Sequence, residues 1–144
     1  MKAYIDSSVI LRIILGEKNA IKLLDNLDEF VASEILKIEC FRTLDRMQRV
    51  LSIAEDEIAV RYAALHCAIR SLRIIKLTDT ISQKACESFP VILKTLDAIH
   101  LASAILWQQQ EEVDILFLTH DEQLAKGALA MGFKVLGTSS NKIF

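Results

Sequence analysis

Four acidic side chains lie in sequence contexts that suit chemistry. Asp6 directly follows the apolar run Ala3–Ile5, and Asp121 follows the run ILFLTH. Asp97 lies among apolar residues in TLDAIHLASA, and Glu39 lies within a long helical pattern. Acids brought together from such separate segments form a cluster of like charges, which either raises their pKa values or holds a cation. Because no set of cysteines and histidines accompanies them, the expected cation is Mg²⁺ or Mn²⁺ and not zinc.

Asp6 and Asp121 are predicted to lie at one edge of a parallel sheet. Each follows a short buried strand, and open α/β sheets bind their ligands outside the carboxyl ends of the strands. We expect Ser7 and Ser8 to cap the helix that follows Asp6. Ser7 and Thr119 are also candidates to donate hydrogen bonds to the carboxylates or to a metal-bound water. The alternative for both acids is a local role as a turn or cap residue.

Asp97 is the acid that is hardest to explain by structure alone. It falls in the first turn of the predicted helix Thr95–Gln109, which has little polar surface and for which Thr95 is the expected cap. Burying a carboxylate is costly unless it is paired or binds a metal. His100, one turn later, is interpreted as a hydrogen-bonded core histidine, and His120 as a residue at the solvent edge.

Glu39 lies on the flank of the predicted helix Glu34–Leu51. A helical wheel at about 100° per residue places it beside the core face and not opposite it. Arg42, Arg46 and Arg49 follow on the same stripe, and the guanidinium fork suits phosphate. Two interpretations stay open: a surface acid paired with Arg42, or a half-buried acid at the rim of a site that is followed by a row of arginines.

The elements that must position these acids alternate between strands and helices. Strands are expected at Ala3–Ile5, Phe30–Ala32, Arg73–Leu77, Asp114–Leu118 and Lys134–Leu136. Helices are expected at Val9–Leu15, Asn19–Leu27, Glu34–Leu51, from the Ser52 and Glu55 capping box to about Leu72, and at Ser82–Ser88, Thr95–Gln109 and Glu122–Met131. This alternation predicts a mostly parallel sheet with helices on both faces. The two long helices form a helical hairpin within one crossover.

Length and composition limit the classes of function. The chain has 144 residues, which fits one domain over residues 1–144. Hydrophobic residues make up 52% of the chain and the mean hydropathy is +0.32, so either both faces of a sheet are covered or apolar surface meets a partner. The net charge of -2 does not attract polyanions, so nucleic-acid binding requires a local basic patch or bound cations.

Cysteine usage and hydropathy point to a cytoplasmic protein. Cys40, Cys67 and Cys86 are odd in number and contain no CxxC pair, so they are expected to be reduced core thiols. The N-terminus lacks a signal-peptide pattern because Asp6 interrupts it. The most apolar later stretch, Val91–Trp107, contains charged residues, which argues against a membrane span.

Four motifs in this order resemble the PIN-domain family and, within it, the VapC-type ribonuclease toxins. The motifs are YIDSSVIL with Asp6; Ser33 followed by Glu39 and Arg42; TLDAIHLASA with Asp97; and LTHDEQLAKGA with Thr119 and Asp121, after which GFKV matches the final strand. The resemblance covers nearly the whole chain. It implies a three-layer α/β/α sandwich with a parallel sheet in the order 3-2-1-4-5.

The same resemblance implies a metal site and a reaction. Asp6, Asp97 and Asp121 would hold Mg²⁺ or Mn²⁺, and Glu39 would hold it through water or bind a second ion. The reaction would be hydrolysis of single-stranded RNA by a metal-activated water attacking the phosphorus in line.

The resemblance also implies substrate contacts and partners. Arg42, Arg46 and Arg49 are candidates to grip the RNA backbone. Family members are typically homodimers that a small antitoxin protein inhibits. The alternative hypothesis is a PIN module that binds RNA or protein without catalysis.

Overall fold

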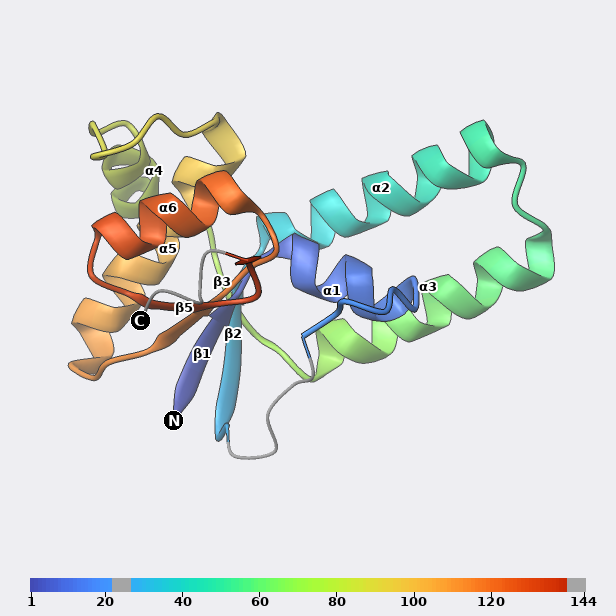
Figure 1. The fold of residues 1–144 in the computed structure, drawn as a ribbon, viewed down its shortest axis with the longest axis horizontal. Coiled ribbons are helices and arrows are strands. Elements are labelled where there is room, and N and C mark those ends of the chain that lie inside the picture. The colour runs from blue at the N-terminus through green and yellow to red at the C-terminus, as the bar shows by residue number, and fades with distance from the viewer. Residues whose placement is uncertain (22–26, 140–144) are drawn as a thin grey trace.

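Five parallel strands form the centre of the computed structural model, which describes residues 1–21 and 27–139 (Figure 1). The strands are β1 (Lys2–Ile5), β2 (Glu29–Ser33), β3 (Arg73–Ile75), β4 (Leu116–Leu118) and β5 (Lys134–Leu136). Their order in the sheet is β3-β2-β1-β4-β5, and every neighbouring pair is parallel. The predicted order is therefore confirmed, and β1 is the central strand.

Two groups of helices cover the two faces of this sheet. The helices are α1 (Ser7–Ile14), α2 (Ile35–Leu51), α3 (Glu55–Arg70), α4 (Asp79–Ala85), α5 (Thr95–Glu111) and α6 (Glu122–Ala130). Helices α1 to α3 lie on one side of the sheet and α4 to α6 on the other (Figure 1). This arrangement is the predicted three-layer sandwich.

Side chains of the central strand alternate between two hydrophobic cores. Ala3 and Ile5 join the core formed with α1, α2 and α3, whereas Tyr4 joins the core formed with α5 and α6. Successive side chains of a strand point to opposite faces, so a strand covered on both sides is apolar throughout. Both cores are therefore anchored on β1, and Asp6 is the first residue beyond its carboxyl end.

Helices α2 and α3 form the predicted hairpin, which extends away from the sheet (Figure 1). The predicted capping box of Ser52 and Glu55 is wrong. Ser52 adopts the left-handed conformation, with φ of 49°, that ends α2, and α3 begins at Glu55 without a side-chain cap. Three acids in the first turn of α3 favour this start through the helix dipole.

Most element boundaries agree with the sequence patterns within two residues, and the largest difference is in α4. This helix begins at Asp79 and not at Ser82, because the Thr78 hydroxyl accepts a hydrogen bond from the Ile81 N–H at 3.2 Å and so caps it. The helix predicted at Asn19–Leu27 lies largely outside the described residues, and residues 19–21 are not helical.

The cysteines differ from expectation in their burial. All three are free thiols, but only Cys40 is buried, in the core beneath α2. Cys67 and Cys86 are exposed, because they lie on the outer side of α3 and directly after α4. Within the described ranges, no helix has both the length and the apolar character needed to cross a membrane.

Candidate active site

The carboxyl edge of the sheet brings the first and fourth motifs together. Strands β1 and β4 are parallel neighbours with Ile5 opposite Leu118. The Asp6 N–H continues the ladder by donating to the Leu118 carbonyl at 3.2 Å. Asp121 follows Leu118 by three residues, so both acids leave the sheet at the same edge, as predicted.

Asp6 is a buried carboxylate with only 4% of its surface exposed. Burial raises its pKa to about 6, and the charge of Glu39 adds to this effect. His100 and the hydroxyls of Ser8 and Thr119 act in the opposite direction by stabilising the charged form. Asp6 therefore sits in a site where a negative charge is held at a cost in free energy.

Ser8 connects Asp6 to the loop after β4. Its hydroxyl donates to Asp6 Oδ1 at 2.6 Å and accepts a hydrogen bond from the His120 N–H at 2.8 Å. The sequence analysis gave Ser8 only a capping role, and neither Ser7 nor Ser8 caps α1, because the helix begins at Ser7 itself. Among the described residues, Ser7 makes no hydrogen bond to an acid of the site, although it is buried. The i,i+2 spacing of Ser8 from Asp6 is the one local signal that could have indicated this contact.

Asp121 combines a cap with a place in the site. Its Oδ1 accepts a hydrogen bond from the Leu124 N–H at 2.7 Å and caps α6, as the structural alternative predicts. The Thr119 hydroxyl accepts from the Asp121 N–H at 3.0 Å, which fixes the turn between β4 and α6. Asp121 is exposed, and one oxygen of its carboxylate is occupied by the hydrogen bond that caps α6.

Asp97 is half-buried and opens onto a pocket of about 440 Å³. The pocket is lined by Glu39, Lys94, Thr95, Leu96, Asp97, Asp121 and Gln123. Partial burial raises the pKa of Asp97, and the charges of Asp121 and Glu39 raise it further. Thr95 is the first residue of α5 and does not cap it. Three of the four predicted acids therefore share one pocket.

Glu39 is the acid that comes from the hairpin side of the molecule. It lies on α2 with 20% of its side chain exposed, and its Oε1 is 2.5 Å from His100 Nε2. Glu39 is half-buried, as one of the two interpretations predicts, and lines the pocket with Asp97 and Asp121. The alternative pairing with Arg42 is not observed, because Arg42 pairs with Asp45 at 3.2 Å.

His120 differs from expectation, because it is buried and not at the solvent edge. Its Nδ1 donates to the Gly137 carbonyl at 2.7 Å, and its Nε2 accepts from the Ile21 N–H at 3.2 Å. These two bonds assign a neutral ring, and burial lowers its pKa. His120 therefore joins two loops behind the site and does not face the pocket of Asp97.

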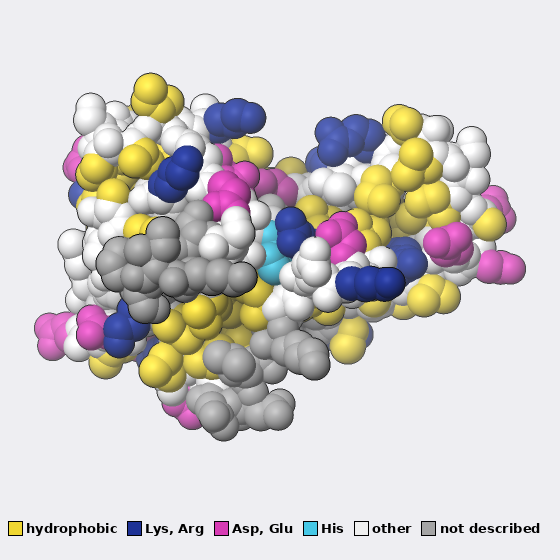
Figure 2. Space-filling model, in the orientation of Figure 1, with side chains coloured by type: hydrophobic (Ala, Val, Ile, Leu, Met, Phe, Trp, Pro, Cys, Tyr) yellow, Lys and Arg dark blue, Asp and Glu magenta, His cyan; other side chains and the backbone are white. Residues whose placement is uncertain are grey.

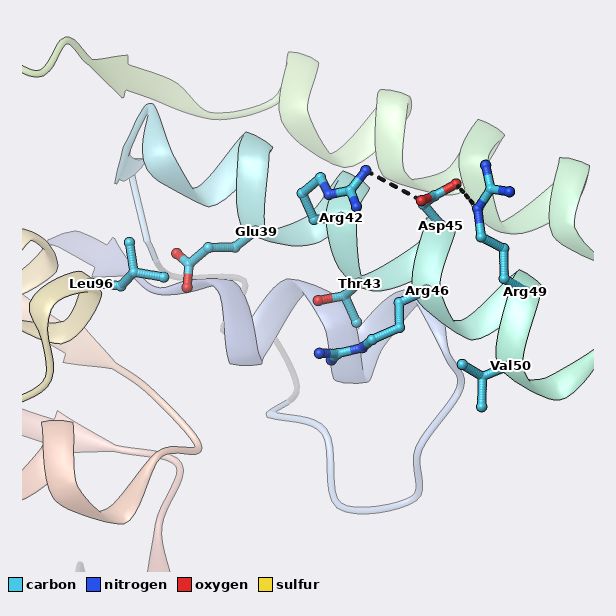
Figure 3. Close-up of a pocket in the computed structure, with 8 residues that line it drawn as sticks. All are labelled: Glu39, Arg42, Thr43, Asp45, Arg46, Arg49, Val50 and Leu96. Carbon is cyan, nitrogen blue, oxygen red and sulfur yellow. Dashed lines mark hydrogen bonds and ion pairs between the residues drawn. The ribbon is translucent and has the colours of Figure 1, made fainter.

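A basic groove adjoins the acid pocket along α2 (Figure 3). It shares Glu39 and Leu96 with the acid pocket and continues past Thr43 to Val50. Its other lining residues are Arg42, Asp45, Arg46 and Arg49. Figure 2 shows acidic side chains gathered in the hollow between the hairpin and the rest of the molecule, with Lys or Arg side chains on the hairpin above it.

The three arginines of this groove are not equivalent. Asp45 pairs with Arg42 at 3.2 Å and with Arg49 at 3.1 Å. Within the described part of the chain, Arg46 has no ion-pair partner, and Figure 3 draws it beside Thr43 on the opposite side of the helix from Asp45. Arg46 is therefore the guanidinium of this row that an anionic ligand would reach without breaking a pair.

The donor set of the acid pocket fits a hard divalent cation. The carboxylates of the pocket and the nearby Asp6 offer only oxygen ligands. Burial is the main cause of the raised pKa values of Asp6 and Asp97, neighbouring carboxylates raise them further, and a bound cation would favour the charged forms. In residues 1–21 and 27–139, no three His, Cys, Asp or Glu side chains are close enough to form a ready-made cage. The residues present thus match the chemistry of Mg²⁺ or Mn²⁺ without a preformed coordination shell.

Comparisons with known proteins find solved structures that share this fold. A chain of the VapBC2 complex from Rickettsia felis, bound to a DNA fragment from its promoter, superposes with a TM-score of 0.66 over 94% of this chain and 98% of that one, at 12% identity. PAE2754 from Pyrobaculum aerophilum superposes with a TM-score of 0.63 over 99% and 86%, at 13% identity. A comparison with curated proteins gives no significant match. The sequence profile of the PIN domain matches residues 3–129, and the chain therefore belongs to the PIN-domain family.

Proposed function

We propose that this chain is an endoribonuclease that hydrolyses the phosphodiester bonds of single-stranded RNA and requires Mg²⁺ or Mn²⁺. The observation that carries the proposal is that Glu39, Asp97 and Asp121 line one pocket, and that Asp6 lies near enough to Glu39 for their charges to interact. These acids come from four separate segments of the chain. Membership of the PIN-domain family supports a nuclease, since PIN domains are generally hydrolases of this class.

The carboxylates would hold the cation. Asp6, Asp97 and Asp121 would be direct ligands, and Glu39 would act through water or at a second ion. When bound, a divalent cation supplies positive charge to the phosphate and lowers the pKa of a water molecule. Ser8 holds Asp6 in place at 2.6 Å, and Thr119 holds the turn that presents Asp121. Ser7 is proposed to contact water in the site.

The basic groove would hold the RNA backbone beside the acids. Arg42, Arg46 and Arg49 are the proposed phosphate contacts, and Arg46 is the strongest candidate because Asp45 neutralises the other two. A phosphate bound near Arg46 would place the next part of the strand toward Glu39, since the two pockets share that residue.

Replacing Arg46 by glutamine is expected to weaken RNA binding more than the same change at Arg42. Loss of one phosphate contact lowers the slope of log K against log salt by about 0.7 for a single strand. The measurement is a salt titration of RNA binding by fluorescence anisotropy with both variants. Equal effects of the two substitutions would contradict the assignment of Arg46.

A toxin of a toxin–antitoxin pair is the biological role that we propose. The fold neighbour from Rickettsia felis is part of a VapBC complex, and this likeness supports a small antitoxin protein as the partner. We also propose that residues 1–144 form a single domain. The protein would act as a homodimer in the cytoplasm. Co-purification of the chain with a small protein encoded beside it would test the partner.

Cleavage of a single-stranded RNA by the purified protein tests the activity. With Mg²⁺ or Mn²⁺ present, the wild type is expected to cleave, and EDTA is expected to abolish the reaction. Asp97→Asn is expected to lower kcat by at least about a hundredfold, since it removes a ligand and a charge at once. Asp114→Asn, an exposed acid before β4, is the matched control and should cleave like the wild type.

The outcomes separate the hypotheses. Cleavage that survives Asp97→Asn would reject the site. RNA binding without turnover in any divalent metal would favour the alternative of a non-catalytic PIN module that binds RNA or protein.

A further inference from the structure

His100 is buried and has a hydrogen-bond partner at each of its two ring nitrogens. It has 1% of its surface exposed and lies on α5, one turn after Asp97. Its Nδ1 is 2.9 Å from the Tyr4 hydroxyl, and its Nε2 is 2.5 Å from Glu39 Oε1. The imidazole therefore bridges the central strand and the one site acid that belongs to α2.

A chain of hydrogen bonds connects this ring to the backbone at the end of β2. The Ser33 N–H donates to the Tyr4 hydroxyl at 3.2 Å, and burial raises the pKa of Tyr4, so the phenol keeps its proton. The Tyr4 hydroxyl thus bridges the Ser33 N–H and His100 Nδ1. An ionised carboxylate can only accept, so His100 Nε2 donates its proton to Glu39. A chain of hydrogen bonds therefore runs from the end of β2 to the carboxylate.

Glu39 needs such support more than the other acids do. Asp6 is held by Ser8, and Asp121 is held by its cap on α6. Glutamate has one more side-chain torsion than aspartate, and each free torsion must be ordered before the carboxylate acts. In the described residues, the one hydrogen bond of the Glu39 side chain is the bond from His100 to Oε1. Oε2 has no hydrogen-bond partner among the described residues, and Glu39 lines the acid pocket.

We infer that His100 is a positioning residue that fixes the Glu39 carboxylate toward the acid pocket, with Tyr4 fixing His100 in turn. The inference rests on the proposed function, because it assigns a role for Glu39 in holding the divalent cation. The geometry makes His100 a donor through Nε2 and not a metal ligand, since both ring nitrogens already have partners.

Two substitutions of His100 separate its two contacts. The side-chain amide of asparagine occupies roughly the place of Nδ1 and does not reach Glu39. Glutamine places its amide nitrogen near Nε2 and keeps a donor to Glu39. His100→Asn is therefore expected to lower kcat for RNA cleavage and to raise the Kd for Mn²⁺, each by about 10–100-fold, with KM for RNA unchanged within about threefold. His100→Gln is expected to recover most of both losses.

A double-mutant cycle with Glu39→Gln shows whether His100 acts through Glu39. If it does, His100→Asn adds no further loss of kcat or Mn²⁺ affinity on the Glu39→Gln background. Mn²⁺ affinity is measured by titration calorimetry without RNA, so this readout is independent of turnover. His66→Asn, an exposed histidine on α3, is the matched control and should leave both quantities unchanged.

The results fall into distinct classes. Wild-type values for His100→Asn, or full additivity with Glu39→Gln, would overturn the positioning role and leave the proposed function intact. A wild type that neither cleaves RNA nor binds Mn²⁺ would overturn the proposed function and this inference with it. Should His100→Asn fail to fold, Tyr4→Phe replaces it, because it frees the imidazole while the ring stays stacked on Phe117 at 5.2 Å. Unchanged Mn²⁺ affinity in Tyr4→Phe would then overturn the inference.

Discussion

Asp6 is a carboxylate whose burial disfavours its charged form. Its carboxylate is buried at the end of the central strand and receives one short hydrogen bond from Ser8. The hydroxyl does not offset the cost of burial, so the pKa rises from 3.8 to about 6. A cation bound beside this carboxylate would stabilise its charged form and so offset the cost of burial.

This pKa makes the stability of the metal-free protein depend on pH. Between about pH 4 and pH 6 the folded state keeps a proton that the unfolded state releases, so the free energy of unfolding falls as pH rises through that window and stays low above it. Asp6→Asn removes this term. Urea unfolding in EDTA is expected to show the variant gaining about 2–3 kcal/mol relative to the wild type between pH 4 and pH 7.5. A difference that does not change with pH would contradict the raised pKa.

The residues that the sequence analysis missed are those whose roles depend on contacts distant in the chain. The positions of the four acids on their elements were predictable because strand ends and helix faces have local patterns; the acids are Asp6, Glu39, Asp97 and Asp121. Ser8 gains its role only where β4 brings the His120 N–H to it, 112 residues away. His120 was placed at the solvent edge, because nothing in the local pattern reveals that residues 21 and 137 cover it.

At the scale of elements, the turn after β5 sets the position of the fourth motif. Gly137 has φ of 115°, and a Cβ added there would lie 2.2 Å from the Thr119 carbonyl oxygen. Its own carbonyl accepts from His120 Nδ1 at 2.7 Å. The end of β5 and the loop that carries Thr119 and Asp121 therefore fit together only with a glycine at this position.

Gly137→Ala is expected to destabilise the protein by about 3–5 kcal/mol, because the added methyl meets rigid backbone and the backbone angle is unfavourable for alanine. Gly132→Ala is the matched control. Gly132 also has a positive φ of 90°, but no atom lies within 4 Å of the added Cβ, so only the conformational cost of about 1–2 kcal/mol applies. Thermal unfolding of the two variants compares them. Equal losses would show that the contact with Thr119 carries no energy.

The strand and helix pattern was the most predictable level of the structure. Short apolar runs located the five strands, helical patterns located most of the helices, and their alternation then predicted a parallel sheet. The predicted start of α4 at Ser82 is wrong because the Thr78 side chain caps the helix earlier in the chain, at Asp79. The predicted capping box at Ser52 is wrong because Ser52 ends α2 and does not begin α3.

At the scale of the whole molecule, the central strand β1 contributes both to the cores and to the candidate site. Its side chains anchor both cores, and its carboxyl end supplies Asp6. The hairpin of α2 and α3 brings Glu39 and the arginine row to the same edge from one side, while α5 brings Asp97 from the other. The site is thus assembled only when the sheet and both helical layers are in place.

Binding of Mn²⁺ to the metal-free protein tests the convergence of these acids most directly. A cation that binds only the folded state at about 100 times its Kd stabilises by about 2.7 kcal/mol, which corresponds to a rise in Tm of about 5–10 °C for a chain of this size. We expect this rise for the wild type and for Asp114→Asn, and its loss in Asp97→Asn. No rise in the wild type, or an equal rise in Asp97→Asn, would contradict the assignment of Asp6, Glu39, Asp97 and Asp121 to one metal-binding site.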